Sequence, residues 1–111
     1  MIEDLTPEQV AARLANLDTR PLLVDVREPW ERARAAIPDS LHVPLWELPS
    51  RLEEIPRDRD VIIYCHHGTR SHQAVRWLAA QGFGGESQRL ANLSGGIDAW
   101  SRTVDPTIEQ Y

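Results

Sequence analysis

The sequence predicts an α/β fold: one domain over residues 1–111, with a central parallel sheet of about four to five strands flanked by helices on both faces. Short apolar runs, bounded by proline, glycine or charged residues, alternate with segments whose apolar residues recur at helical spacing. Strands that alternate with helices pair in parallel through right-handed crossovers, which place the helices on the faces of the sheet. A chain of 111 residues can bury enough surface to fold without a metal or a disulfide.

In the first half of the chain, the segment Thr6-Pro7-Glu8-Gln9 begins a helix over about residues 7–17. It offers a capping hydroxyl, a proline at the first helical position and a glutamine for a capping box. Residues 22–26 are apolar and too few for a helix, so they predict a buried strand. The next three elements are a helix over residues 29–36, a strand over 41–43 and a helix over 45–55 that is interrupted or starts near Pro49. Prolines make the bounds of these elements hard to place.

In the second half, residues 61–65 form an apolar run that predicts the strand carrying Cys65. Residues 71–81 have apolar side chains on one helical face, and Gly82 ends that helix. Residues 90–93 predict the last strand. Two glycines then turn the chain into a short helix over residues 97–100.

Two of the predicted strands end in chemically distinctive residues. Asp25 and Arg27 close one strand and Cys65 closes another, and binding sites collect at the carboxyl ends of parallel strands, so the two groups are expected to share one rim. Asp25 and Arg27 predict a structural ion pair there. The tryptophans are expected to cover the sheet, with Trp46 as an alternative wall of a pocket; they are Trp30, Trp46, Trp77 and Trp100.

Composition excludes several classes of partner and location. Twelve basic and seventeen acidic residues give a formal charge of −5, which argues against general affinity for nucleic acid or anionic membranes. A lone cysteine forms no internal disulfide, and Met1 is followed by acidic and polar residues rather than a charged and then apolar leader. We therefore expect a cytoplasmic location, with no nucleic-acid or membrane partner.

The segment from Cys65 to Arg70 carries the candidate chemistry. A thiol between a strand and a helix N-terminus is surrounded by outward amide N–H groups and nearby cationic side chains, which favour the nucleophilic thiolate. Gly68 lets the backbone turn inward, and Arg70 supplies a fixed positive charge, with pairing to an acidic neighbour as its alternative role. The loop is therefore expected to be an anion cradle with an open thiol at its floor. Two chemistries fit it: attack on a phosphate or arsenate, and attack on the outer sulfur of a sulfane donor.

The loop Cys-His-His-Gly-Thr-Arg-Ser resembles the active-site loop of the rhodanese family of sulfurtransferases. The similarity continues, in the family's order, through four further segments that are distributed along most of the chain. They are Asp25-Val26-Arg27-Glu28, Trp30-Glu31, Ile37 to Leu45, and Leu93 to Trp100. The resemblance implies a rhodanese-like domain over residues 1–111. It also implies that Cys65 is catalytic, taking sulfur from thiosulfate or a persulfide and passing it to cyanide, a thiol or a sulfur-carrier protein. The candidate substrate-binding residues are His66, His67, Gly68, Thr69 and Arg70. His66 and His67 have two alternative roles, assisting the thiolate or being solvated loop residues.

Loop length favours sulfur transfer over the alternatives. The six residues from Cys65 to Arg70 match the sulfurtransferases, whereas the related phosphatases and arsenate reductases have one more. A non-catalytic, protein-binding rhodanese-like module is the other alternative, and its usual mark is a replaced cysteine. Because the chain has no second cysteine, the sulfur acceptor must come from outside. The tail through Tyr111 resembles rhodanese regions fused to sulfur-carrier adenylating enzymes, so such an enzyme or thioredoxin is the expected protein partner.

A metal centre is not expected at this loop, and neither is any cofactor. Cys65, His66, His67 and His72 are of zinc-ligand types, but adjacent histidines on so short a loop do not readily close a tetrahedron. No Cys-x-x-Cys pair accompanies them, and no carboxylate partner is expected nearby.

Overall fold

Five parallel strands form the central sheet of the computed structural model, which describes residues 2–111. Across the sheet the order is β1-β5-β4-β2-β3, and every neighbouring pair is parallel. The strands are β1 (Ile2–Leu5), β2 (Leu22–Asp25), β3 (Leu41–His42), β4 (Val61–Tyr64) and β5 (Leu90–Leu93). All side chains of β4 and β5 are buried, as expected for central strands covered on both faces.

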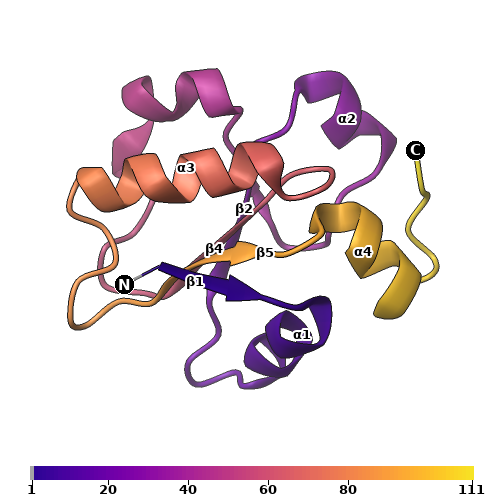
Figure 1. Ribbon diagram of the computed structural model, residues 1–111, viewed down its shortest axis with the longest axis horizontal. Helices are drawn as coiled ribbons and strands as arrows, with labels where there is room; N and C mark the ends of the chain where they lie inside the picture. Colours follow the sequence, from indigo (N-terminus) through magenta and orange to yellow (C-terminus); the bar gives the residue numbers. More distant parts are fainter. Residues whose placement is uncertain (1) are drawn as a thin grey trace.

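Helices cover both faces of the sheet (Figure 1). They are α1 (Pro7–Ala15), α2 (Pro29–Arg34), α3 (Thr69–Ala80) and α4 (Gly96–Thr103), with two 3₁₀ helices, η1 (Leu45–Ser50) and η2 (Leu52–Glu54). One apolar cluster packs α3, η1 and η2 against one face, and a second packs α1 and α4 against the other. The predicted α/β fold with a flanked parallel sheet is therefore confirmed.

Local signals account for two of the helices. In α1 the Thr6 hydroxyl accepts from the Gln9 N–H at 3.2 Å, and the Gln9 side chain accepts from the Thr6 N–H at 2.9 Å, so the predicted capping box forms. The segment over residues 45–55, predicted as a helix interrupted or started near Pro49, consists of the two 3₁₀ helices η1 and η2. Pro49 lacks a backbone donor and disfavours a continuous α-helix there.

The sequence did not predict β1. Glu3 and Asp4 disfavour a strand by propensity, but parallel pairing with β5 supplies hydrogen bonds along this polar edge. The expectation that all four tryptophans cover the sheet is wrong for two of them. Trp100 is buried in the core, whereas Trp30 and Trp46 are 62% and 67% exposed. Among residues 2–111, no helix has both the length and the apolar character that crossing a membrane requires.

Candidate active site

Cys65 directly follows β4 and lies four residues before the start of α3, at the carboxyl edge of the sheet. The beginning of α4 holds this position from behind. The N–H of Ile97 donates to the carbonyl of Cys65 at 2.9 Å, and the N–H of Asp98 donates to that of His66 at 3.0 Å. Gly96 makes this approach possible, because a side chain on it would overlap both of these carbonyl oxygens.

The loop closes around the sulfur atom as a ring of donors. Gly68 has a φ of 103°, a left-handed conformation that glycine adopts without strain, and its N–H donates to Cys65 Sγ at 3.1 Å. The N–H of Ser71, in the first turn of α3, donates to the same atom at 3.4 Å. These amides stabilise negative charge on the sulfur, as does the positive end of α3.

The thiol lies deeper than the open cradle that the sequence predicts. Cys65 is only 1% exposed and belongs to the apolar cluster beneath α3, together with Ala74 and Val75. Its Sγ nevertheless faces the amides of the loop rather than the hydrocarbon. The sulfur is therefore enclosed, with amide donors of the loop on one side and almost none of the residue exposed.

Ser71 and Asn92 complete the floor of the ring, and neither was predicted as a site residue. The Ser71 hydroxyl lies 3.3 Å from Cys65 Sγ and donates to Asn92 Oδ1 at 2.5 Å. Asn92 in turn donates to Asp4 at 3.0 Å. One hydroxyl proton cannot serve two acceptors at once, so the Ser71 hydroxyl donates either to Cys65 Sγ or to Asn92 Oδ1. Asn92 is the polar residue of the otherwise apolar strand β5, and this position in the sequence is the signal that could have identified it as a site residue.

Arg70 is the predicted anion-binding residue, and it is engaged by a carboxylate. Its Nη1 and Nη2 donate to the two oxygens of Glu31 in α2, at 2.6 and 2.9 Å. Arg70 is 35% exposed at its side chain and Glu31 is 3% exposed. The alternative considered for Arg70, pairing with an acidic neighbour, is thus the observed arrangement. Glu31 occurs in one of the motifs discussed above, but nothing in the sequence links it to Arg70.

Several donors fix the Glu31 carboxylate. Besides Arg70, the N–H of Glu28 donates to it at 3.0 Å and the Tyr111 hydroxyl at 2.8 Å. Burial alone raises the pKa of Glu31, but the hydrogen bonds from Arg70, Glu28 and Tyr111 outweigh it and lower the pKa to about 2. Glu31 is therefore ionised throughout the neutral range.

Tyr111 ties the C-terminal tail to the site. Its hydroxyl accepts from Arg27 Nη1 at 2.6 Å, and its ring stacks on His66 with centroids 4.0 Å apart. Burial, followed by donation to Glu31, raises the pKa of Tyr111 to about 12 against the opposing effect of Arg27. Arg27 also pairs with Asp25 at 2.8 Å, and both side chains are fully buried, so the predicted structural ion pair is confirmed.

His66 and His67 stack on each other at the rim, with ring centroids 3.9 Å apart. Burial and the charge of His67 lower the pKa of His66, which favours its neutral form. The two imidazoles and Asp98 place their ligand-type atoms within 4.8 Å of one another, so the expectation that no carboxylate lies near these histidines is wrong. Stacked rings direct their lone pairs side by side rather than to one point, and Asp98 already accepts from Arg102 at 3.1 Å. We therefore assign no metal to this group. Thr69 begins α3 and is exposed.

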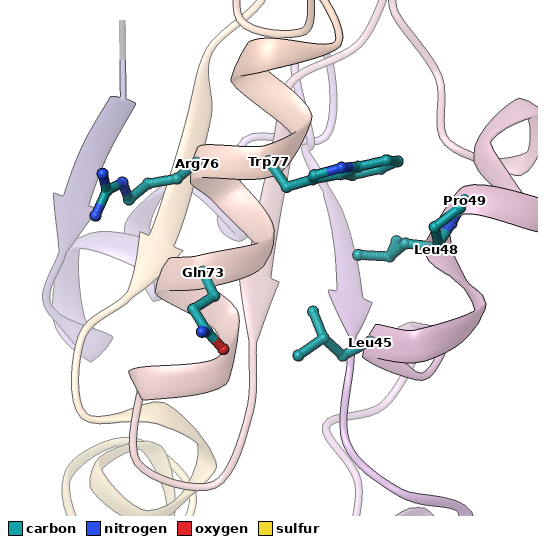
Figure 2. A pocket seen from close by; sticks show the side chains of 6 residues that line it. All are labelled: Leu45, Leu48, Pro49, Gln73, Arg76 and Trp77. Atoms are coloured by element: carbon teal, nitrogen blue, oxygen red, sulfur yellow. The ribbon is translucent and has the colours of Figure 1, made fainter.

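An apolar groove lies between η1 and α3 (Figure 2). Its volume is about 450 Å³, and its walls are η1 and α3. It is lined by Leu45, Leu48, Pro49, Gln73, Arg76 and Trp77. No residue of the loop from Cys65 to Arg70 lines this groove.

Comparison with known proteins identifies the family. The rhodanese-like domain model matches residues 6–103. The chain belongs to the rhodanese family. A sulfurtransferase from Allochromatium vinosum is 47% identical to this rhodanese over 108 residues, which are 97% of this chain and 96% of that protein. Thiosulfate sulfurtransferase GlpE of Pseudomonas syringae is 30% identical and covers 89% of this chain and 87% of its own.

Solved structures agree with the family assignment. A rhodanese-related protein from Thermoplasma volcanium superposes with a TM-score of 0.79 at 26% identity, covering 98% of this chain and 99% of that one. The sulfurtransferases similar in sequence to this rhodanese support sulfur transfer as its general activity.

Proposed function

We propose that this rhodanese moves sulfane sulfur from thiosulfate or a persulfide to a thiophilic acceptor, through a persulfide on Cys65. The observation that carries the proposal is the donor ring on Cys65 Sγ, in which the N–H groups of Gly68 and Ser71 converge on one sulfur atom. Such a ring stabilises the thiolate before the reaction and the terminal persulfide sulfur after it.

The first half-reaction loads the sulfur. The Cys65 thiolate attacks the outer sulfur of the donor, a new S–S bond forms, and the donor's own S–S bond breaks. The leaving group takes the electron pair: sulfite from thiosulfate, or a thiolate from a persulfide. Cys65 is left as an anionic persulfide, and the thiol proton of an initially neutral enzyme is released to solvent before the attack. The Ser71 hydroxyl, 3.3 Å from Cys65 Sγ, can donate to the sulfur anion.

The second half-reaction transfers the sulfur from Cys65 to the acceptor. A nucleophilic acceptor, such as cyanide or a thiolate, attacks the terminal sulfur, and the persulfide S–S bond breaks to return the electron pair to Cys65. Because Cys65 is the only cysteine of the 111 residues, no internal thiol can resolve the persulfide. The acceptor is therefore a separate molecule: a small thiophile, thioredoxin, or a sulfur-carrier protein with its adenylating enzyme.

The remaining loop residues each contribute a different part of the binding site for the sulfur donor. Gly68 and the start of α3 at Thr69 supply backbone N–H groups and the helix dipole. His66 and His67 form the stacked wall of the entrance, and Arg70 closes its outer side together with Glu31.

Steady-state kinetics with thiosulfate and cyanide test the proposal. We expect thiocyanate formation with the parallel double-reciprocal lines of a ping-pong mechanism. Cys65→Ser should abolish the reaction while keeping the thermal transition of the parent. Activity that survives in Cys65→Ser, or its absence in the parent with thiosulfate and with every persulfide donor, would contradict the proposal.

A further inference from the structure

The charge of the rim around Cys65 is balanced by a single buried carboxylate. Arg70 is the one arginine of the six-residue loop, and both of its terminal nitrogens are bonded to Glu31. A bidentate pair of this geometry leaves the guanidinium little freedom to turn toward an incoming anion. The carboxylate of Glu31 therefore neutralises the fixed positive charge of Arg70 that was expected at the mouth of the ring.

Glu31 cannot easily move away from Arg70. Its oxygens also accept from the Glu28 N–H and from the Tyr111 hydroxyl, and Arg27 holds that hydroxyl at 2.6 Å. With a pKa of about 2, the carboxylate stays ionised under any working condition. The neutralised rim is therefore a property of the resting protein.

The other ionic groups near the ring are balanced in the same way. Arg27 pairs with Asp25 behind Tyr111, and Arg102 pairs with Asp98 beside His67. His66 is shifted toward its neutral form. What attracts an anion at Cys65 is then the amide ring and the dipole of α3, which together amount to less than one full charge.

We propose that Glu31 sets the donor class of this rhodanese, by making the site favour singly charged sulfane donors, such as thiol persulfides and thiosulfonates, over the thiosulfate dianion. The inference rests on the proposed function, which it refines. A dianion gains twice as much as a monoanion from each unit of positive charge at the rim. Restoring one unit of net charge should therefore favour the dianion by about tenfold at the effective dielectric of a protein surface.

Glu31→Gln tests this directly, because glutamine keeps the size of the side chain and removes its charge. The probes are thiosulfate, a dianion, and methanethiosulfonate, a monoanion, each with cyanide as acceptor. Both donate the outer sulfur as their S–S bond breaks, with sulfite or methanesulfinate leaving. We expect the ratio of kcat/KM, thiosulfate over methanethiosulfonate, to rise about tenfold in Glu31→Gln. Arg70→Ala should lower this ratio.

Glu28→Gln is the matched control. Glu28 is an exposed carboxylate on the same turn, and it bonds to the Trp46 indole rather than to a guanidinium. Its substitution should leave the donor ratio within about twofold of the parent, because an exposed charge is well screened. An unchanged ratio in Glu31→Gln, with both donors still active, would overturn the inference and leave the proposed function intact. Failure of both donors and of a thiol persulfide in the parent would overturn the proposed function itself.

The salt dependence of the parent protein gives a second test that requires no variant. On a chain of net charge −5 with a neutralised rim, added salt screens overall repulsion, so kcat/KM for thiosulfate should stay level or rise between roughly 20 and 200 mM salt. A steep fall over this range would mean that Arg70 acts as a free cation toward the donor, and would contradict the inference.

Discussion

Two carboxylate–guanidinium pairs lie within one hydrogen-bonded network at the carboxyl edge of the sheet, and they differ in their surroundings. Asp25 and Arg27 are completely buried, whereas Arg70 is one-third exposed at the mouth of the loop and only its partner Glu31 is buried. The Tyr111 hydroxyl joins the two pairs. The difference teaches that the same kind of ion pair can have two roles: the Asp25–Arg27 pair stabilises the fold, whereas the Glu31–Arg70 pair adjusts the charge of the site.

The largest stability effect is expected at the fully buried pair. Arg27→Met keeps much of the side-chain volume but leaves Asp25 charged and without its main partner, which should cost about 3–5 kcal/mol of unfolding free energy. Urea denaturation measures it. Arg34→Met is the control, because Arg34 and Glu109 form a half-exposed pair whose loss should cost less than about 1 kcal/mol. Equal losses in the two variants would remove the distinction between buried and exposed pairs.

Acid should weaken the second pair over a defined range. The pKa of Glu31 is lowered to about 2 in the folded protein from an ordinary value of 4.5. Its contribution is therefore fully present above pH 4.5 and is lost as the pH falls toward 2, a loss of up to about 3 kcal/mol. Urea denaturation at a series of pH values should show a flatter acid limb in Glu31→Gln than in the parent. Identical limbs would show that Glu31 is not the group responsible.

Removing the exposed member of the second pair should cost less than removing Arg27. Arg70→Ala leaves the buried Glu31 with two remaining donors, the Glu28 N–H and the Tyr111 hydroxyl, and should cost about 2 kcal/mol. Thermal or urea unfolding of the variant provides the measurement. A loss as large as that of Arg27→Met would mean that the rim pair supports the fold as strongly as the buried one.

The smallest effect is expected where the two pairs meet. Tyr111→Phe keeps the ring that stacks on His66 and removes only the hydroxyl between Arg27 and Glu31, for a loss of about 1 kcal/mol. In a double-mutant cycle, Tyr111→Phe should couple with Glu31→Gln by at least about 0.5 kcal/mol. Strict additivity would show that the tail does not support the carboxylate.

Local patterns were sufficient for the parts of this protein whose structure is set by nearby residues. The apolar runs of β4 and β5, the helical face of α3 and the Asp25–Arg27 pair follow from spacing within a few residues, and all were predicted. The strand β1 was missed because its polar residues become a strand only through pairing with β5.

The missed site residues share one physical reason. Glu31 meets Arg70 across 39 positions, Tyr111 meets Glu31 across 80, and Asn92 meets Ser71 across 21. Such contacts depend on how α2, β5 and the tail assemble around α3, which no local periodicity encodes. The sequence could therefore predict Cys65 and its loop as the candidate site, but not Glu31, the partner of Arg70.

The most direct test of sulfur transfer is the intact mass of the freshly reduced protein before and after exposure to thiosulfate and to methanethiosulfonate. We predict that the protein gains the mass of one sulfur atom, that the added sulfur maps to the peptide containing Cys65, and that cyanide removes it. An unchanged mass with both donors and with a thiol persulfide, or an added sulfur on any other residue, would contradict a persulfide at the floor of this loop.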